Sequence, residues 1–212
     1  MTDASTTSQG GARSAIALEY ATIGVSAAEA IGALVSGVLA HSLALVAFGA
    51  DSIIEMLSAS VVLFQVRSLV SAGTRTPRSE HRAHRILAVL FFILAAYVVA
   101  SALDDFVHAI HPSENVLGFV VCIASGVIMP ALAFAKRRTS LQLTRSGFSS
   151  LGSLLASDAA ETALCGWLSV STLVGVGMTA WMGWWWADPV ASLAVVYFAL
   201  REGREAWECD PD

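Results

Sequence analysis

The fold is decided by the stretch SLALVAFGADSIIE at residues 42–55, where two carboxylates interrupt a run that is otherwise uncharged and apolar. Asp51 and Glu55 are four residues apart, so they share one face of a helix. With the apolar residues that follow as far as Phe64, the run is long enough to cross a bilayer. An ionised side chain at that depth costs about 2.5–3.5 kcal/mol on insertion scales. The two carboxylates therefore require compensation, either from a cation or from protons.

The composition is that of a membrane protein. Of the 212 residues, 56% are hydrophobic and 14% are charged, and the mean hydropathy is +0.67. These values are too apolar for a soluble domain of this size. The net charge of −5 and the absence of a basic stripe argue against a nucleic-acid partner.

Windows of about 20 residues, the length of a membrane-spanning helix, divide the chain into six apolar segments. Five lie at residues 16–38, 43–66, 86–103, 116–135 and 148–178. The sixth begins after Asp188, which is suited to an N-cap, and Pro189, which fits the first helical position. We predict an all-α, polytopic membrane protein, with a disordered tail at 1–14, six transmembrane helices within 15–203 and a short cytoplasmic tail at 204–212.

The basic residues predict the orientation, because cytoplasmic loops are enriched in Lys and Arg. All 12 basic residues fall on one side if both termini are cytoplasmic, and the segment 136–145 is assigned to a cytoplasmic loop. We therefore predict a multi-pass protein of the cell membrane with both termini inside.

Further acids lie within the apolar segments. Asp158 and Glu161 stand in the fifth segment, with Cys165 on the same face, and Glu29 stands in the first. Counting roughly ten to thirteen residues inward at 1.5 Å per residue places Glu29, Asp51 and Asp158 near the bilayer midplane. We expect no Lys, Arg or His at that depth.

Five ionised carboxylates would cost about 12–17 kcal/mol together, more than the stability of a typical domain. Either a cation lies among them or most are protonated, and a site that alternates between these conditions is a metal/proton exchanger. The expected metal ligands are Asp51, Glu55, Asp158 and Glu161, with Glu29 and Cys165 as possible additional ligands or proton carriers. The alternative for each acid is a neutral group that is hydrogen-bonded to a neighbouring helix. Glu19, close to the cytoplasmic end of the first segment, is expected to be solvated.

The stretch at residues 42–55 resembles the second-helix signature of the cation diffusion facilitators, in which Ser-x-Ala-Leu-x-Ala precedes Asp-Ser-x-x-Asp. Ser157-Asp158 in the fifth segment and Asp188-Pro189 at the sixth also match that family's pattern. The resemblance implies proton-coupled export of divalent transition metals such as zinc by alternating access, in a bilayer and as a homodimer.

The resemblance implies Asp51, Glu55 and Asp158 as ligands. The family's fourth ligand, a histidine, falls on Leu154, which cannot bind metal, so Glu161 or Glu29 would complete the set. Because imidazole suits zinc, an all-carboxylate set indicates manganese or iron as alternative substrates. Familiar members continue into a soluble cytoplasmic domain, whereas only about a dozen residues follow the sixth segment here, so we expect the dimer to form through the membrane helices.

Two other functional classes remain open at this point. In the first, the same carboxylates hold a structural ion or protons in a membrane protein that binds metal or a partner without transporting. An enzyme is the less favoured class, because no serine or cysteine has a recognisable base partner in the sequence.

Overall fold

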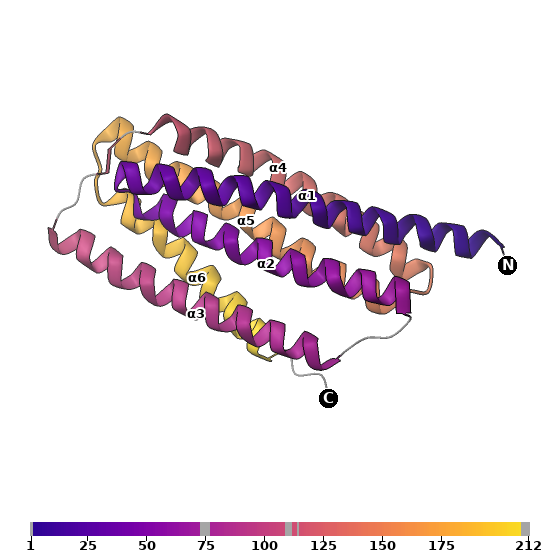
Figure 1. Ribbon diagram of the computed structural model, residues 1–212. Helices are drawn as coiled ribbons and strands as arrows, with labels where there is room; N and C mark the ends of the chain where they lie inside the picture. The colour runs from indigo at the N-terminus through magenta and orange to yellow at the C-terminus, as the bar shows by residue number, and fades with distance from the viewer. Residues whose placement is uncertain (1, 73–76, 109–111, 114, 209–212) are drawn as a thin grey trace.

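The computed structural model describes residues 2–72, 77–108, 112–113 and 115–208. The elements of these ranges are all helices: α1 (Thr2–Ala40), α2 (Leu43–Ala72), α3 (Pro77–His108), α4 (Val116–Arg145), α5 (Ser149–Met182) and α6 (Ala187–Glu208). The predicted all-α class is therefore confirmed. Successive helices run in opposite directions, so the beginning of α1 and the end of α6 lie at the same end of the bundle (Figure 1).

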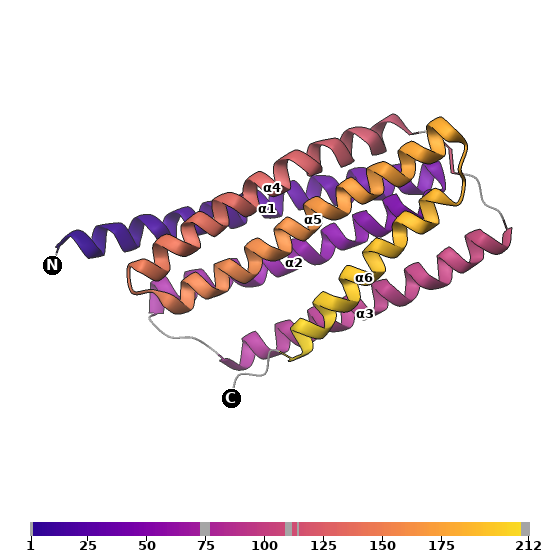
Figure 2. The same ribbon diagram turned by 180° about the vertical axis from the view of Figure 1, so that it is seen from behind.

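The helices form two groups. α1, α2, α4 and α5 pack on one another, with the closest pairings between α4 and α5 and between α1 and α2. α3 pairs with α6, and this pair lies against α2 and α5 (Figure 2). The largest buried apolar cluster, which includes Phe48 of α2 and Val98 of α3, joins both groups.

Among the helices of the described residues, α1 to α5 are long and apolar enough to cross a membrane, and α6 is not. Asp188 near its start and the charged residues from Arg201 onward leave α6 only residues 189–200 as an uncharged stretch, which is shorter than the ~20 residues of a typical span. The sixth span and the cytoplasmic position of both termini stay predictions.

The helices extend beyond the apolar segments that predicted them. α1 includes residues 2–14, for which the sequence predicts a disordered tail, and α6 continues to Glu208. Residues 209–212 of the predicted cytoplasmic tail lie outside the described residues. The division at 1–14, 15–203 and 204–212 stays a prediction.

The largest difference between the predicted and the observed helices concerns α4. It continues through residues 136–145, which the sequence assigns to a cytoplasmic loop. Buried side chains recur along this segment at helical spacing, at Lys136, Thr139, Ser140 and Leu143. This spacing gives the segment a buried face that apolarity alone does not reveal. α4 ends only where Gly147 adopts a left-handed conformation, at φ 88°.

Asp188 joins α6 to the start of α2 instead of capping its own helix. Its carboxylate accepts hydrogen bonds from Ser42 Oγ at 2.5 Å and from the backbone N–H of Ala44 at 3.1 Å. A carboxylate is favoured at a helix N-terminus, where backbone N–H groups have no partner within the helix. This contact fixes the end of α2 that precedes Asp51 by two turns.

Candidate cation site

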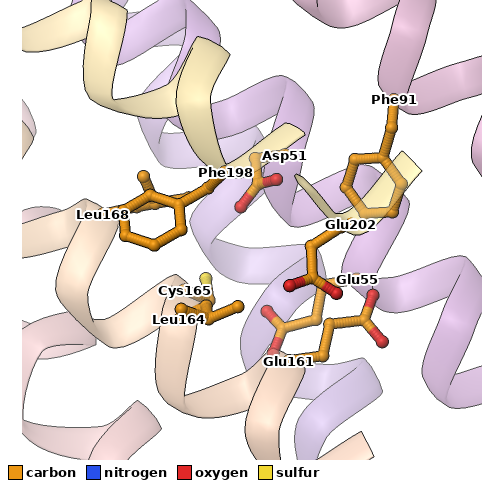
Figure 3. Close-up of a pocket in the computed structure, with 9 residues that line it drawn as sticks. All are labelled: Asp51, Glu55, Phe91, Glu161, Leu164, Cys165, Leu168, Phe198 and Glu202. Atoms are coloured by element: carbon orange, nitrogen blue, oxygen red, sulfur yellow. The ribbon is translucent and has the colours of Figure 1, made fainter. Parts of the chain in front are cut away.

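Four carboxylates from three helices line one pocket between α2, α5, α6 and α3. α2 contributes Asp51 and Glu55, α5 contributes Glu161, and α6 contributes Glu202. The remaining lining side chains are Cys165 and the apolar residues Phe91, Leu164, Leu168 and Phe198. Figure 3 shows the side chains of Glu55, Glu161 and Glu202 near one another, with Cys165 on the side toward which Glu55 extends.

Two of these acids are held by serine hydroxyls. Ser26 of α1 donates to Glu55 Oε2 at 3.1 Å, and Ser58 of α2 donates to Glu161 Oε2 at 2.6 Å. Each hydrogen bond occupies one carboxylate oxygen and fixes the direction of the other. Hydroxyls from neighbouring helices therefore orient the carboxylates of Glu55 and Glu161.

Glu29 lies next to this pocket on its α1 side. Its Oε2 is 4.0 Å from the Sγ of Cys165. Ligand atoms of Glu29, Glu55 and Cys165 all lie within 4.8 Å of one another, and all three residues are buried. The arrangement brings one acid from α1, one acid from α2 and one thiol from α5 together.

Asp158 points into a different cluster. The ammonium of Lys136 on α4 donates to Asp158 Oδ2, to Glu19 Oε2 at 3.1 Å and to Thr162 Oγ1 at 3.2 Å. Lys136 and Glu19 are fully buried. The expectation that no basic residue accompanies the buried acids, and that Glu19 is solvated, is wrong on both counts. A tethered cation already compensates these two carboxylates.

The structure thus divides the predicted ligand set. Asp51, Glu55 and Glu161 share the pocket, whereas Asp158 belongs to the Lys136 cluster. Cys165 lines the pocket and Glu29 adjoins it. Whether each of them binds metal stays a prediction.

Leu154, the position to which the resemblance assigns the missing histidine, is remote from the pocket. It packs against the second apolar cluster, which contains Val66, Leu143 and Leu151. Leu154 precedes Glu161 by seven residues, about 10 Å along α5, and does not line the pocket.

Neither Glu202 in the pocket nor the buried position of Lys136 is among the predicted features, yet helical spacing contains a signal for both. Glu202 follows the buried Val195 and Ala199 by seven and three residues, so it continues their face. Lys136 follows the buried Met129 and Ala133 in the same way. Both residues are charged, and charge alone predicts an exposed position, whereas their spacing predicts a buried one.

A family model for the cation efflux transmembrane domain matches residues 20–208. Transmembrane protein 163 of Xenopus laevis is 27% identical over 144 residues, which cover 66% of this chain and 50% of that protein. An uncharacterized transporter of Synechocystis is 25% identical over 196 residues, which cover 89% of this chain and 61% of that protein. The chain therefore spans about half to three-fifths of the length of these relatives.

Proposed function

We propose that this chain, which belongs to the cation efflux family, exports a divalent transition-metal cation across a membrane in exchange for protons. The observation that carries the proposal is the pocket lined by Asp51, Glu55, Glu161 and Glu202. Among its nine lining residues there is no Lys, Arg or His to balance the acids.

The charge of the pocket accounts for the exchange. Each uncompensated carboxylate within a bilayer costs about 2.5–3.5 kcal/mol, so the pocket acids hold either a cation or protons. A divalent cation binds to deprotonated ligands, so its arrival releases protons and its departure takes them up. Alternating access then couples metal export to the proton gradient.

The rest of the predicted arrangement is part of the same proposal. The Lys and Arg residues outside the Lys136 cluster support a cytoplasmic position for both termini, with α6 as the sixth span of a cell-membrane protein. The working unit is a homodimer in the bilayer. The substrate is zinc or a chemically similar ion, or else manganese or iron, if the ligands are carboxylates alone.

The proposal is tested by metal uptake into proteoliposomes that contain the purified chain. Asp51→Asn and Glu161→Gln are expected to abolish uptake, because each removes a pocket carboxylate with almost no change in volume. The matched control is Glu205→Gln, which removes an exposed carboxylate on α6 that pairs with Arg201 and is expected to leave uptake unchanged. Unchanged uptake by both pocket variants would refute the assignment.

A second function is favoured by the Lys136 cluster. There, two buried acids are compensated within the protein, without an external ion. If the pocket acids are structural too, and hold an ion that is never released, the chain binds metal but does not transport it. Metal binding by the purified protein without uptake into proteoliposomes would select this function.

A further inference from the structure

Glu29, Glu55 and Cys165 form a compact group that only partly coincides with the pocket. Glu55 and Cys165 line the pocket (Figure 3), whereas Glu29 approaches them from α1. Because their ligand atoms are at most 4.8 Å apart, some point lies within about 2.8 Å of all three. Zinc binds sulfur at about 2.3 Å and carboxylate oxygen at about 2.0–2.2 Å, so small side-chain movements bring the three atoms to ligating distance.

Two oxygens of this group have no hydrogen-bond partner. Glu29 Oε1 and Glu55 Oε1 are both buried and unpaired, while Ser26 occupies the other oxygen of Glu55. Glu29 as a whole is 5% exposed and Glu55 is 3% exposed. A buried polar atom without a partner is unfavourable, and a bound ligand would remove that cost.

A third unpaired atom adjoins the group. The hydroxyls of Ser125 on α4 and Ser52 on α2 lie near the Glu29 carboxylate, and Ser125 Oγ is buried with no partner at full hydrogen-bond distance. Buried oxygens without a partner at full hydrogen-bond distance therefore occur on both acids of the group and on a hydroxyl beside it.

We propose that Glu29, Glu55 and Cys165 form a second cation position that adjoins the pocket and shares Glu55 and Cys165 with it. The proposal rests on the proposed function and deepens it. The substrate cation passes between the carboxylates of Asp51 and Glu161 on one side and Glu29 on the other, while Glu55 and Cys165 contact it in both positions. Glu29 is thus a ligand for the transported ion.

The donor set defines the class of ion. A thiolate with two carboxylates favours borderline divalent metals such as zinc, cobalt and cadmium, whereas magnesium, calcium and manganese prefer oxygen donors alone. The presence of Cys165 therefore directs the choice of substrate toward the zinc class and away from manganese.

The test uses the full chain in detergent with cobalt(II) as the probe, because sulfur-to-cobalt charge transfer gives a near-ultraviolet absorption band. The wild type is expected to show this band on cobalt addition, and Cys165→Ser is expected to lose it. Cys122→Ser, which alters another buried free cysteine, is the matched control and is expected to keep the band. If the wild type itself shows no band on cobalt addition, the proposal is overturned and no variant is needed.

Glu29→Gln tests the third ligand. It is expected to weaken cobalt binding at least tenfold, in line with the effect of altering groups around a metal, and to shift the band. Glu29→Asp, which keeps the carboxylate, is expected to restore part of the affinity. Binding by Glu29→Gln that equals the wild type overturns the role of Glu29, and displacement of cobalt by an equal concentration of manganese overturns the ion class.

These outcomes are distinct from failure of the proposed function. A cobalt–thiolate band that Glu29→Gln weakens and shifts, without flux in proteoliposomes, refutes transport but supports the second cation position. Flux without the band supports transport and overturns the second position.

Discussion

Replacing Lys136 by methionine is expected to destabilise the protein severely, because it leaves two buried acids without their shared cation. The ammonium contacts Glu19 at 3.1 Å and Thr162 at 3.2 Å and also binds Asp158, with Lys136 and Glu19 fully buried. Removing one partner of a buried ion pair costs about 3–5 kcal/mol. Since about 1.4 kcal/mol is a factor of ten, the ratio of unfolded to folded protein rises about 10²–10⁴-fold.

The assay is denaturant-induced unfolding in detergent, followed by the loss of helical circular dichroism. Arg137→Met is the matched control, because Arg137 is exposed on the same helix and a surface substitution usually changes stability by at most about 0.5 kcal/mol. The triple variant Glu19→Gln/Lys136→Met/Asp158→Asn removes all three charges together and is expected to regain most of the lost stability. A stable Lys136→Met protein, or a triple variant as unstable as the single one, would refute this reasoning.

Three further predictions concern two helix contacts and the pH dependence of metal binding. Asp188→Ala removes the acceptor of the Ser42 hydroxyl and the Ala44 N–H. It is expected to lower the free energy of unfolding by about 0.5–2 kcal/mol, as the loss of other N-terminal helix caps does. An unchanged denaturation midpoint would contradict this. Gly175→Ala places a Cβ 2.3 Å from Ala191 Cβ on α6 and is expected to lower the free energy of unfolding by about 1–3 kcal/mol. Gly24→Ala, where nothing lies within 4 Å, is expected to raise it by about 0.5–1 kcal/mol. Equal effects in the same unfolding assay would contradict the close α5–α6 contact. Metal affinity is expected to fall as the pH is lowered, because the carboxylate and thiol ligands bind metal only when deprotonated. Calorimetric titrations in mildly alkaline and mildly acidic buffer check this. The same affinity in both buffers would contradict proton release on metal binding.

The sequence predicts much of the fold because apolar length is a strong signal. The α2 stretch at residues 42–55 is sufficient to identify the helix, its paired acids and the family resemblance, which the family match over residues 20–208 confirms. Helical spacing also places Glu161 and Cys165 on one face of α5, and the structure has both in the pocket.

The position of Asp158 could not be predicted in the same way. Its role depends on Lys136, which is 22 residues away in sequence. Lys136 stands next to two arginines, and the enrichment of basic residues in cytoplasmic loops assigns this segment to such a loop. A buried lysine is energetically acceptable only because Glu19 and Asp158 meet it in space. That meeting depends on the packing of three helices, which no single segment encodes.

The central claim is exchange of a divalent metal for protons at the pocket acids. The measurement that tests it most directly is metal-triggered proton movement in proteoliposomes that contain a pH-sensitive dye, with wild type and Asp51→Asn/Glu161→Gln compared after addition of zinc, cobalt, cadmium, iron(II) or manganese. The account predicts proton movement with wild type only, strongest with ions of the zinc class. Folded wild-type protein that moves no protons with any of these ions, or a double variant that moves them equally well, would contradict it.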